Sequence, residues 1–208
     1  MKNASFLLVS IFSFIYGAGQ PATTSNAMSQ EFIALTKMGG GGVTAFQSYS
    51  SNQVDGSQFF LPDWHKGEVV TNNKDVFNQG FQFVYDKVRQ ELFIRQKDSA
   101  LILTGNKEDI KFFKLKNAGN EYLFVNSAMY TDTKPVFFYQ VLVSDSSRFT
   151  LLKYNKTKFV KADRTDMMKE RDGNVYDAFV DENTYYIVKG KSGPEPVQLK
   201  TKAVRKVF

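Results

Sequence analysis

Few side chains in this sequence are suited to acid–base or nucleophilic chemistry. There is no cysteine and a single histidine, His65, so cysteine nucleophiles, thiolate metal sites and zinc sites made of several histidines are excluded. His65 follows Asp63 and Trp64 in "PDWHKG", and a Ser-His-Asp arrangement would need a serine that the fold brings in. No Gly-x-Ser-x-Gly pattern is present, and no pair of carboxylates stands out for hydrolysis. The sequence therefore predicts a noncatalytic protein without a cofactor, in which His65 lies in a surface turn.

The acidic residues of segment 155–182 raise the question of a calcium loop, which can be tested by counting. If Gly173 were the central glycine of such a loop, one ligand position would fall on Met168 and the closing acid on Phe179. Neither side chain offers the oxygen that calcium needs. The sequence thus predicts no metal site and assigns this segment to a charged insertion outside the core. A looser carboxylate site stays open, with Asp163, Asp166 and Asp177 as its candidate ligands.

The stretch "NQGFQFVYD", residues 78–86, nearly matches the aromatic strand with which one class of RNA-binding sheet stacks bases. That pattern needs a basic residue near its start and an aromatic residue at its end, but this stretch has Gln79 and Asp86 there. An acidic side chain at that end repels phosphate, so the sequence predicts no nucleic-acid partner. The alternation places Phe81, Phe83 and Tyr85 on one face of a strand, which is expected to pack in a core.

Positive charge is concentrated toward the C-terminal end. The chain has a net charge of +6, and from Lys189 onward six basic residues stand against the single Glu195. We expect this end to form a final strand that runs into a short basic helix, with a surface suited to an acidic envelope protein, an anionic envelope polymer or anionic lipid. A solvated amphipathic end is the alternative interpretation. The basic residues of this predicted binding surface are Lys189, Lys191, Lys200, Lys202, Arg205 and Lys206.

The first residues have the pattern of a secretory signal peptide. Lys2 precedes an apolar run from Phe6 to Tyr16, and the small residues "GAG" follow, which predicts a signal peptide over residues 1–19. The run is too short to cross a bilayer. We therefore expect a secreted or periplasmic protein that is associated with the cell envelope and is not transmembrane. Residues 20–56, rich in Ser and Gly and with four consecutive glycines, are predicted to form a flexible arm.

From residue 57 onward, short apolar runs alternate with polar turns, which predicts a single β domain over residues 57–208. The runs are rich in Phe, Tyr, Val and Ile, and the segments between them carry Asp, Asn, Ser or Gly, as chain reversals require. Such short connections favour antiparallel hairpins in a meander, which either stays open or curls into a partly closed barrel. The predicted strands are Glu68–Thr71, Gly80–Tyr85, Glu91–Gln96, Ala100–Thr104, Ile110–Lys116, Glu121–Val125, Val136–Val143, Arg148–Tyr154 and Thr184–Lys189.

The segments "VDGSQFFLPDWHKGEVV", "FQFVYDKVRQELFIRQ", "FFYQVLVSDSSRFTLLKY" and "NTYYIVKG" occur in this order along the chain. Together they resemble a group of small secreted β-rich proteins of Bacteroidota-type bacteria that have no assigned function. The resemblance extends from Val54 to Phe208 and rests on an aspartate-tryptophan turn, a strand pair and a double-tyrosine strand. It implies an envelope-associated β domain, often with a C-terminal helical extension, and it implies no catalytic residue.

Two kinds of function agree with these features. The first is a noncatalytic binding or structural protein of the cell envelope, in which aromatic-rich sheet edges and the basic end contact a protein or an envelope polymer. The second is a carrier of a small apolar molecule, held in a barrel whose interior is lined by Phe81, Phe83 and Tyr85. A filled interior favours the first function and a continuous cavity favours the second. The many bulky aromatic side chains lead us to prefer the first.

Overall fold

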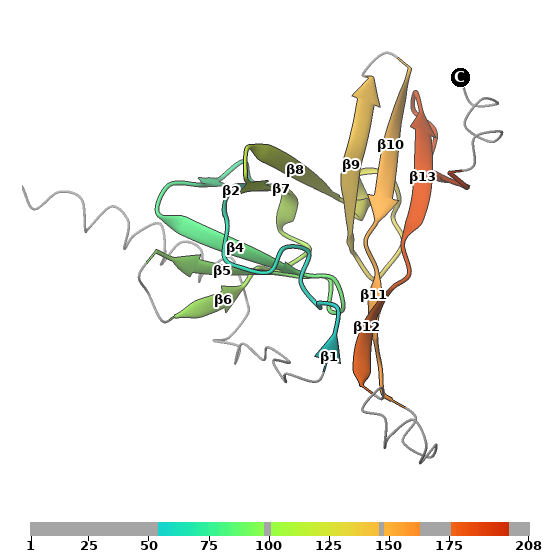
Figure 1. Cartoon of the computed structure of the whole chain (residues 1–208). Coiled ribbons are helices and arrows are strands. Elements are labelled where there is room, and N and C mark those ends of the chain that lie inside the picture. The colour runs from blue at the N-terminus through green and yellow to red at the C-terminus, as the bar shows by residue number, and fades with distance from the viewer. Residues whose placement is uncertain (1–53, 98–100, 146–147, 163–175, 200–208) are drawn as a thin grey trace, which may run out of the picture.

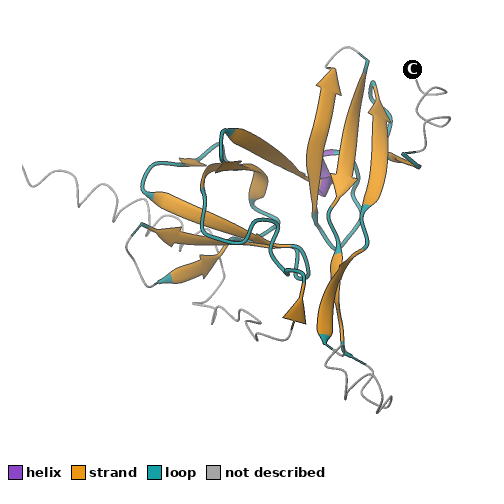
Figure 2. Ribbon diagram, viewed as in Figure 1, coloured by secondary structure: helices purple, strands orange, loops and turns teal. Residues whose placement is uncertain are grey.

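The computed structural model describes residues 54–97, 101–145, 148–162 and 176–199, and this part of the chain consists mainly of β-strands joined by loops and turns (Figure 1, Figure 2). Its helical element is the short 3-10 turn η1, Ser127–Met129. Apolar and aromatic runs form the strands, and polar turns reverse the chain between them. The strands are β1 Val54–Asp55, β2 Lys66–Thr71, β3 Val76–Phe77, β4 Phe81–Asp86, β5 Glu91–Gln96, β6 Ile102–Thr104, β7 Ile110–Asn117, β8 Asn120–Asn126, β9 Phe138–Asp145, β10 Phe149–Tyr154, β11 Thr157–Val160, β12 Asp177–Asp181, β13 Thr184–Lys189 and β14 Glu195–Val197.

These strands form three sheets. The longest has the order β14-β13-β10-β9-β8-β7-β2-β3, and its neighbouring strands are antiparallel. A second, antiparallel sheet has the order β4-β5-β6. In the third sheet, β1-β12-β11, strand β1 pairs in parallel with β12. The fold is therefore mainly β and mainly antiparallel, and none of the three sheets closes into a barrel across the described strands.

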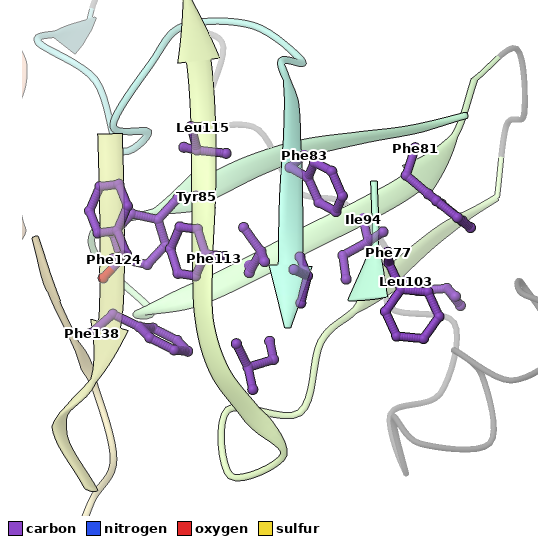
Figure 3. Close-up of a cluster of buried hydrophobic side chains, with 13 residues drawn as sticks. Phe77, Phe81, Phe83, Tyr85, Ile94, Leu103, Phe113, Leu115, Phe124 and Phe138 are labelled. Carbon is purple, nitrogen blue, oxygen red and sulfur yellow. The ribbon is translucent and has the colours of Figure 1, made fainter. Parts of the chain in front are cut away.

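Strand β4 supplies the centre of the main core. Phe81, Phe83 and Tyr85 are at most 2% exposed and lie on the face of β4 that packs against the long sheet (Figure 3). The ring of Tyr85 lies 5.2 Å from that of Phe113 and 5.0 Å from that of Phe124, and the rings of Phe113 and Phe124 stack at 4.7 Å. The two sheets thus meet across a filled aromatic layer, and the predicted core role of the three β4 side chains is confirmed.

The opposite face of β4 is covered by a second layer. Val84 is 2% exposed and packs with Phe59 and Phe93, and the half-buried ring of Trp64 lies against this cluster. Because β4 is packed on both faces, its backbone and side-chain positions are strongly constrained.

Strands β10 and β11 continue one another along the chain, as do β12 and β13. The register that pairs Tyr154 with Thr184 also pairs Thr157 with Asp181, so the four strands form one long two-stranded ribbon (Figure 1). A backbone hydrogen bond of 2.7 Å crosses the short interruption between its two halves. This corrects the predicted charged insertion at 155–182, because both ends of that segment belong to the ribbon.

Buried amide side chains attach this ribbon to the core. Asn155 is 2% exposed, and its side-chain Nδ2 donates to Oε1 of Gln140 at 3.0 Å. The backbone carbonyl oxygen of Asn155 accepts from Nε2 of Gln90 at 2.7 Å. The Oε1 of Gln90 accepts in turn from the hydroxyl of Tyr85 at 2.6 Å. Leaving a buried polar group without its partner costs about 1–3 kcal/mol, so these bonds fix where the ribbon meets strands β4 and β9.

All nine predicted strands are present, and β5 and β13 have the predicted bounds. Four further strands, β1, β3, β11 and β12, do not appear in the sequence prediction, and β14 lies at the start of the final strand expected near the C-terminal end. Strand β1 also shows that the predicted flexible arm, residues 20–56, is ordered at its end, where Val54 and Asp55 pair with β12.

Several predictions concern residues outside the part of the chain that the structure describes. They are the signal peptide at 1–19, the arm as far as residue 53, and the basic helix near the C-terminal end. Within the described ranges, no helix has the length and apolar character that crossing a membrane requires.

Candidate functional site

A groove rich in lysine lies where strands β2, β4 and β7 come together. It consists of two hollows of about 480 and 540 Å³, each within the range of about 300–1,000 Å³ that ligand sites occupy. The first is lined by residues 66–68, 78–82, 97 and 116, and the second by residues 64–66, 82 and 116–121. Lys66, Gln82 and Lys116 line both hollows, so we treat the two as one lysine groove.

The pairing of β2 with β7 places two lysines opposite each other in this groove. In the register of the two strands, Lys66 is the direct partner of Lys116, and like charges at directly opposed positions destabilise a sheet. Lys97, just after β5, adds a third cation to the first hollow. Lys66 and Lys97 form no ion pair within the described ranges. The fold therefore gathers positive charge that an anion would neutralise.

Two acidic side chains border the groove, and neighbouring lysines neutralise them. Glu121 lies 3.4 Å from the ammonium groups of both Lys114 and Lys116, and Glu68 lies 3.6 Å from Lys114. Desolvation acts to raise the pKa of Glu121, but Lys114 and Lys116 outweigh it and hold the pKa below its ordinary value. These three ion pairs are partly or largely solvent-accessible and contribute little to stability, but they keep the two glutamates from cancelling the charge of Lys66 and Lys97.

The groove opens because two strands stop pairing. The N–H of His65 donates to the carbonyl of Phe83 at 2.9 Å, and the N–H of Phe83 donates to the carbonyl of His65 at 2.8 Å. The next opposed pair, Gly67 and Phe81, has no such bond among the described contacts. Strands β2 and β4 therefore separate after His65, and the first hollow lies between their starts.

Gly67 allows β2 to lie close to β7 at this point. A Cβ atom on Gly67 would lie 2.1 Å from the carbonyl oxygen of Lys114 and 3.1 Å from a ring carbon of Phe83. No side chain fits in that space, which explains a glycine between Lys66 and Glu68 in a paired strand.

A stacked side-chain group orients one amide in the groove. The guanidinium carbon of Arg95 lies 4.4 Å from the centre of the Trp64 ring, within the range of a cation–π contact. The Nε of Arg95 donates to Oε1 of Gln82 at 2.9 Å. Because that oxygen is engaged, the NH₂ group of Gln82 is the part of the amide left to donate to a ligand.

The β7–β8 hairpin forms the far wall of the second hollow. Asn117 pairs with Asn120, and between them Ala118 and Gly119 have φ values of 48° and 81°, as a two-residue turn of the primed type requires. The amide side chains of Asn117 and Asn120 flank this turn and line the hollow.

His65 is placed by its backbone, and its ring has no catalytic partner in the described part of the chain. Its Nε2 atom is buried without a hydrogen-bond partner there, so no described serine is bonded to the nitrogen that would act as the base. The side chain is half-buried beside the groove, which corrects the expected surface turn.

The structure does not bring the predicted basic end to this groove. Lys189 and Lys191 are exposed at the end of β13 and in the following turn, and strands β10, β9, β8 and β7 separate β13 from β2 in the long sheet. Lys200, Lys202, Arg205 and Lys206 lie outside the described residues.

The other predicted site residues also have clear positions. The β4 side chains Phe83 and Tyr85 are fully buried in the core, and only Phe81 reaches the edge of the lysine groove, so a core role replaces the alternative of a cavity lining. Asp177 accepts a hydrogen bond from the N–H of Ala162 at 2.9 Å, while Asp163 and Asp166 lie outside the described residues. Across the described ranges, no three acidic or histidine side chains are grouped to hold a metal ion.

The lysine groove was not predicted from the sequence. Lys66 and Lys116 stand fifty positions apart, and only the β2–β7 register makes them neighbours. The signals present were a lysine next to a glycine in "WHKGEVV" and two alternating lysines before a turn in "KLKNAGN", neither of which is specific without the pairing.

Comparisons of this chain with protein-family models, with curated proteins and with solved structures gave no match. The groove must therefore be interpreted from its own geometry and charge.

Proposed function

We propose that this protein is a noncatalytic binding protein of the bacterial cell envelope that holds an anionic polymer in the lysine groove. The single observation that carries the proposal is the opposed pair Lys66 and Lys116, with Lys97 nearby, in hollows of ligand size. Burying or opposing like charges costs free energy unless an opposite charge is supplied. Glu121 supplies one for Lys116, and an anionic chain that lies in the groove would supply it for Lys66 and Lys97.

The filled core supports a binding surface over an internal carrier site. Phe83 and Tyr85 are fully buried, and Tyr85 packs among the rings of Phe113 and Phe124. The hollows described above lie at the surface, between strand starts and turns, where a large polymer has access. A secreted or periplasmic location, proposed from the signal pattern of residues 1–19, would expose this groove to envelope polymers.

The proposal can be tested with two soluble polyanions, polygalacturonate and inorganic polyphosphate. We expect the full chain to bind at least one of them, with an affinity that falls as salt rises. The double substitution Lys66→Gln and Lys116→Gln should weaken binding about tenfold, as the loss of roughly 1.4 kcal/mol would. Isothermal titration calorimetry at two salt concentrations gives these affinities.

The matched control replaces two exposed lysines outside the groove, Lys111→Gln and Lys161→Gln. This variant has the same net charge as the groove variant and should bind within about twofold of the unaltered protein. Equal losses in both variants would mean that only net charge matters, and the groove proposal would then be wrong. Absence of binding to either polymer at low salt would also contradict it.

A further inference from the structure

We infer that the natural ligand of the lysine groove is an acidic polysaccharide, bound as an extended chain across both hollows. This inference rests on the proposed function and specifies its ligand. The first observation is that the two hollows are continuous with each other. The two hollows share Lys66, Gln82 and Lys116 and extend from Lys97 on one side to the β7–β8 turn on the other. A single small anion would occupy only one part of this length.

The second observation is the chemistry of the neutral groups between the cations. The side-chain amides of Gln79, Asn117 and Asn120 line the groove and form no hydrogen bond within the described ranges. Each amide offers both a donor and an acceptor, and a sugar hydroxyl is also both. A polyphosphate chain has acceptors only, so it would leave the amide oxygens unmatched.

The acidic border agrees with this ligand. Glu68 and Glu121 can accept hydrogen bonds from hydroxyl groups, and a polyphosphate chain has no hydroxyl groups along its length to donate to them. Acidic sugars carry one carboxylate per ring, and hydroxyl groups surround it. Lys66, Lys97 and Lys116 would bind the carboxylates, while the amides and the two glutamates would bind hydroxyls.

Other anionic polymers fit the groove less well. Single-stranded nucleic acid binds by stacking its bases on aromatic rings, but Phe81 is 2% exposed and the Trp64 ring is occupied by Arg95 and the cluster beneath it. An acidic peptide would gain specificity from pockets for its side chains, and the groove lining is mostly charged or amide groups.

The test compares galacturonate oligomers of one to six units with polyphosphate chains of equal length and with neutral galactose oligomers. Affinity for the galacturonates should rise at least tenfold from one unit to four and then level off, and the neutral oligomers should bind at least tenfold more weakly than the tetramer. The double substitution Gln79→Met and Gln82→Met should weaken tetragalacturonate binding about tenfold and polyphosphate binding only about threefold, because Gln82 can donate to either ligand whereas Gln79 can also accept from a hydroxyl group. As a control, Gln96→Met with Gln198→Met alters two glutamines outside the groove and should leave both affinities unchanged.

The outcomes separate this inference from the proposed function. If polyphosphate binds as tightly as galacturonate of equal length and the glutamine substitutions have no effect, the groove recognises charge alone and the polysaccharide inference is wrong, while the proposed function stands. Affinity that is already maximal with one unit would also overturn an extended ligand. If the Lys66→Gln and Lys116→Gln variant binds every probe normally, both proposals fail.

Discussion

Asp86 ends strand β4 with a carboxyl group that the fold both buries and uses. The residue is 1% exposed. One of its oxygens accepts from the N–H groups of Val88 and Arg89 at 2.8 and 3.0 Å, and the other accepts from Nε2 of Gln58 at 3.2 Å. Desolvation raises the pKa of this carboxyl group, although the hydrogen bonds partly oppose the rise. The carboxyl group therefore stabilises the turn through the hydrogen bonds that its oxygens accept, while burial makes its negative charge unfavourable.

Replacing Asp86 should separate these two effects. Asp86→Asn keeps an oxygen for the turn and removes the buried charge, so we expect it to be at least as stable as the unaltered protein at pH 7. Asp86→Ala loses the acceptor for two backbone N–H groups and should lower the free energy of unfolding by about 1–3 kcal/mol. Urea unfolding followed by circular dichroism measures both.

The pH dependence gives a second check on Asp86. Since its pKa is raised in the folded state, the protonated form is the stabilising one, and this stability is present at low pH and lost as pH rises through the folded pKa. The advantage of Asp86→Asn should therefore shrink as the pH falls from 7 toward 3. An advantage that grows with acidity would show that the carboxylate is favoured by the fold.

The turn of the β7–β8 hairpin contains an alanine in an unfavourable backbone conformation. Ala118 has a φ of 48°, a left-handed conformation that costs a residue with a Cβ atom roughly 1–2 kcal/mol. Asparagine tolerates this conformation better than alanine. We expect Ala118→Asn to raise the free energy of unfolding by about 0.5–1 kcal/mol, seen as a Tm increase of a few degrees.

A control for this substitution is Ala128→Asn, at an exposed position in η1. It introduces the same side chain without relieving a left-handed backbone, so it should not raise Tm. An equal rise in both variants would attribute the effect to asparagine itself.

The elements that sequence predicts well are those with strong alternation. Strand β4 was placed within one residue of its observed start and end because Phe81, Phe83 and Tyr85 repeat with period two. Strands β11 and β12 were missed because their pairing depends on a register set by β10 and β13, and because they have only four and five residues and stand next to a highly charged segment. Strands β3 and β14 have only two and three residues, too few to show a period.

The candidate site could not be predicted from the sequence, for a different reason. The types of its residues are ordinary, and its character comes from two cross-sheet relations, the opposition of Lys66 to Lys116 and the separation of β2 from β4 after His65. Neither relation is local in sequence. The predicted basic end, by contrast, followed from composition alone.

At the scale of the whole molecule, tyrosine burial makes alkaline pH a test of the fold. The chain has ten tyrosines. Desolvation is the first cause that raises the pKa of Tyr139, to about 12, and it also raises the pKa of Tyr85, Tyr130 and Tyr154. An unfolded tyrosine ionises near pH 10. Their stabilising contribution is thus complete below about pH 10 and is lost as pH rises toward the folded pKa values.

We therefore expect cooperative unfolding as the pH rises above about 10 to 12. Absorbance at 295 nm reports tyrosine ionisation, and circular dichroism reports the sheets; the buried tyrosines should ionise together with the loss of β-structure. Tyr139→Phe keeps the ring and removes the ionisable group, so its transition should move to higher pH. Ionisation of all ten tyrosines near pH 10 with the sheets intact would contradict the packing described here.

The short strand β1 has a consequence for the order of folding. Val54 pairs with Asp177 and Asp55 with Ala178. The residues of β1 and their pairing partners are therefore more than a hundred positions apart in the sequence. Closing so long a loop is entropically costly and is favoured only after nearer contacts have formed. A ribosome or an export channel that releases the chain from its N-terminal end would deliver the core strands β2 to β10 before β12 appears. The parallel pairing of β1 with β12 is then among the last contacts to form, and it closes the fold only after residues 177–181 have emerged.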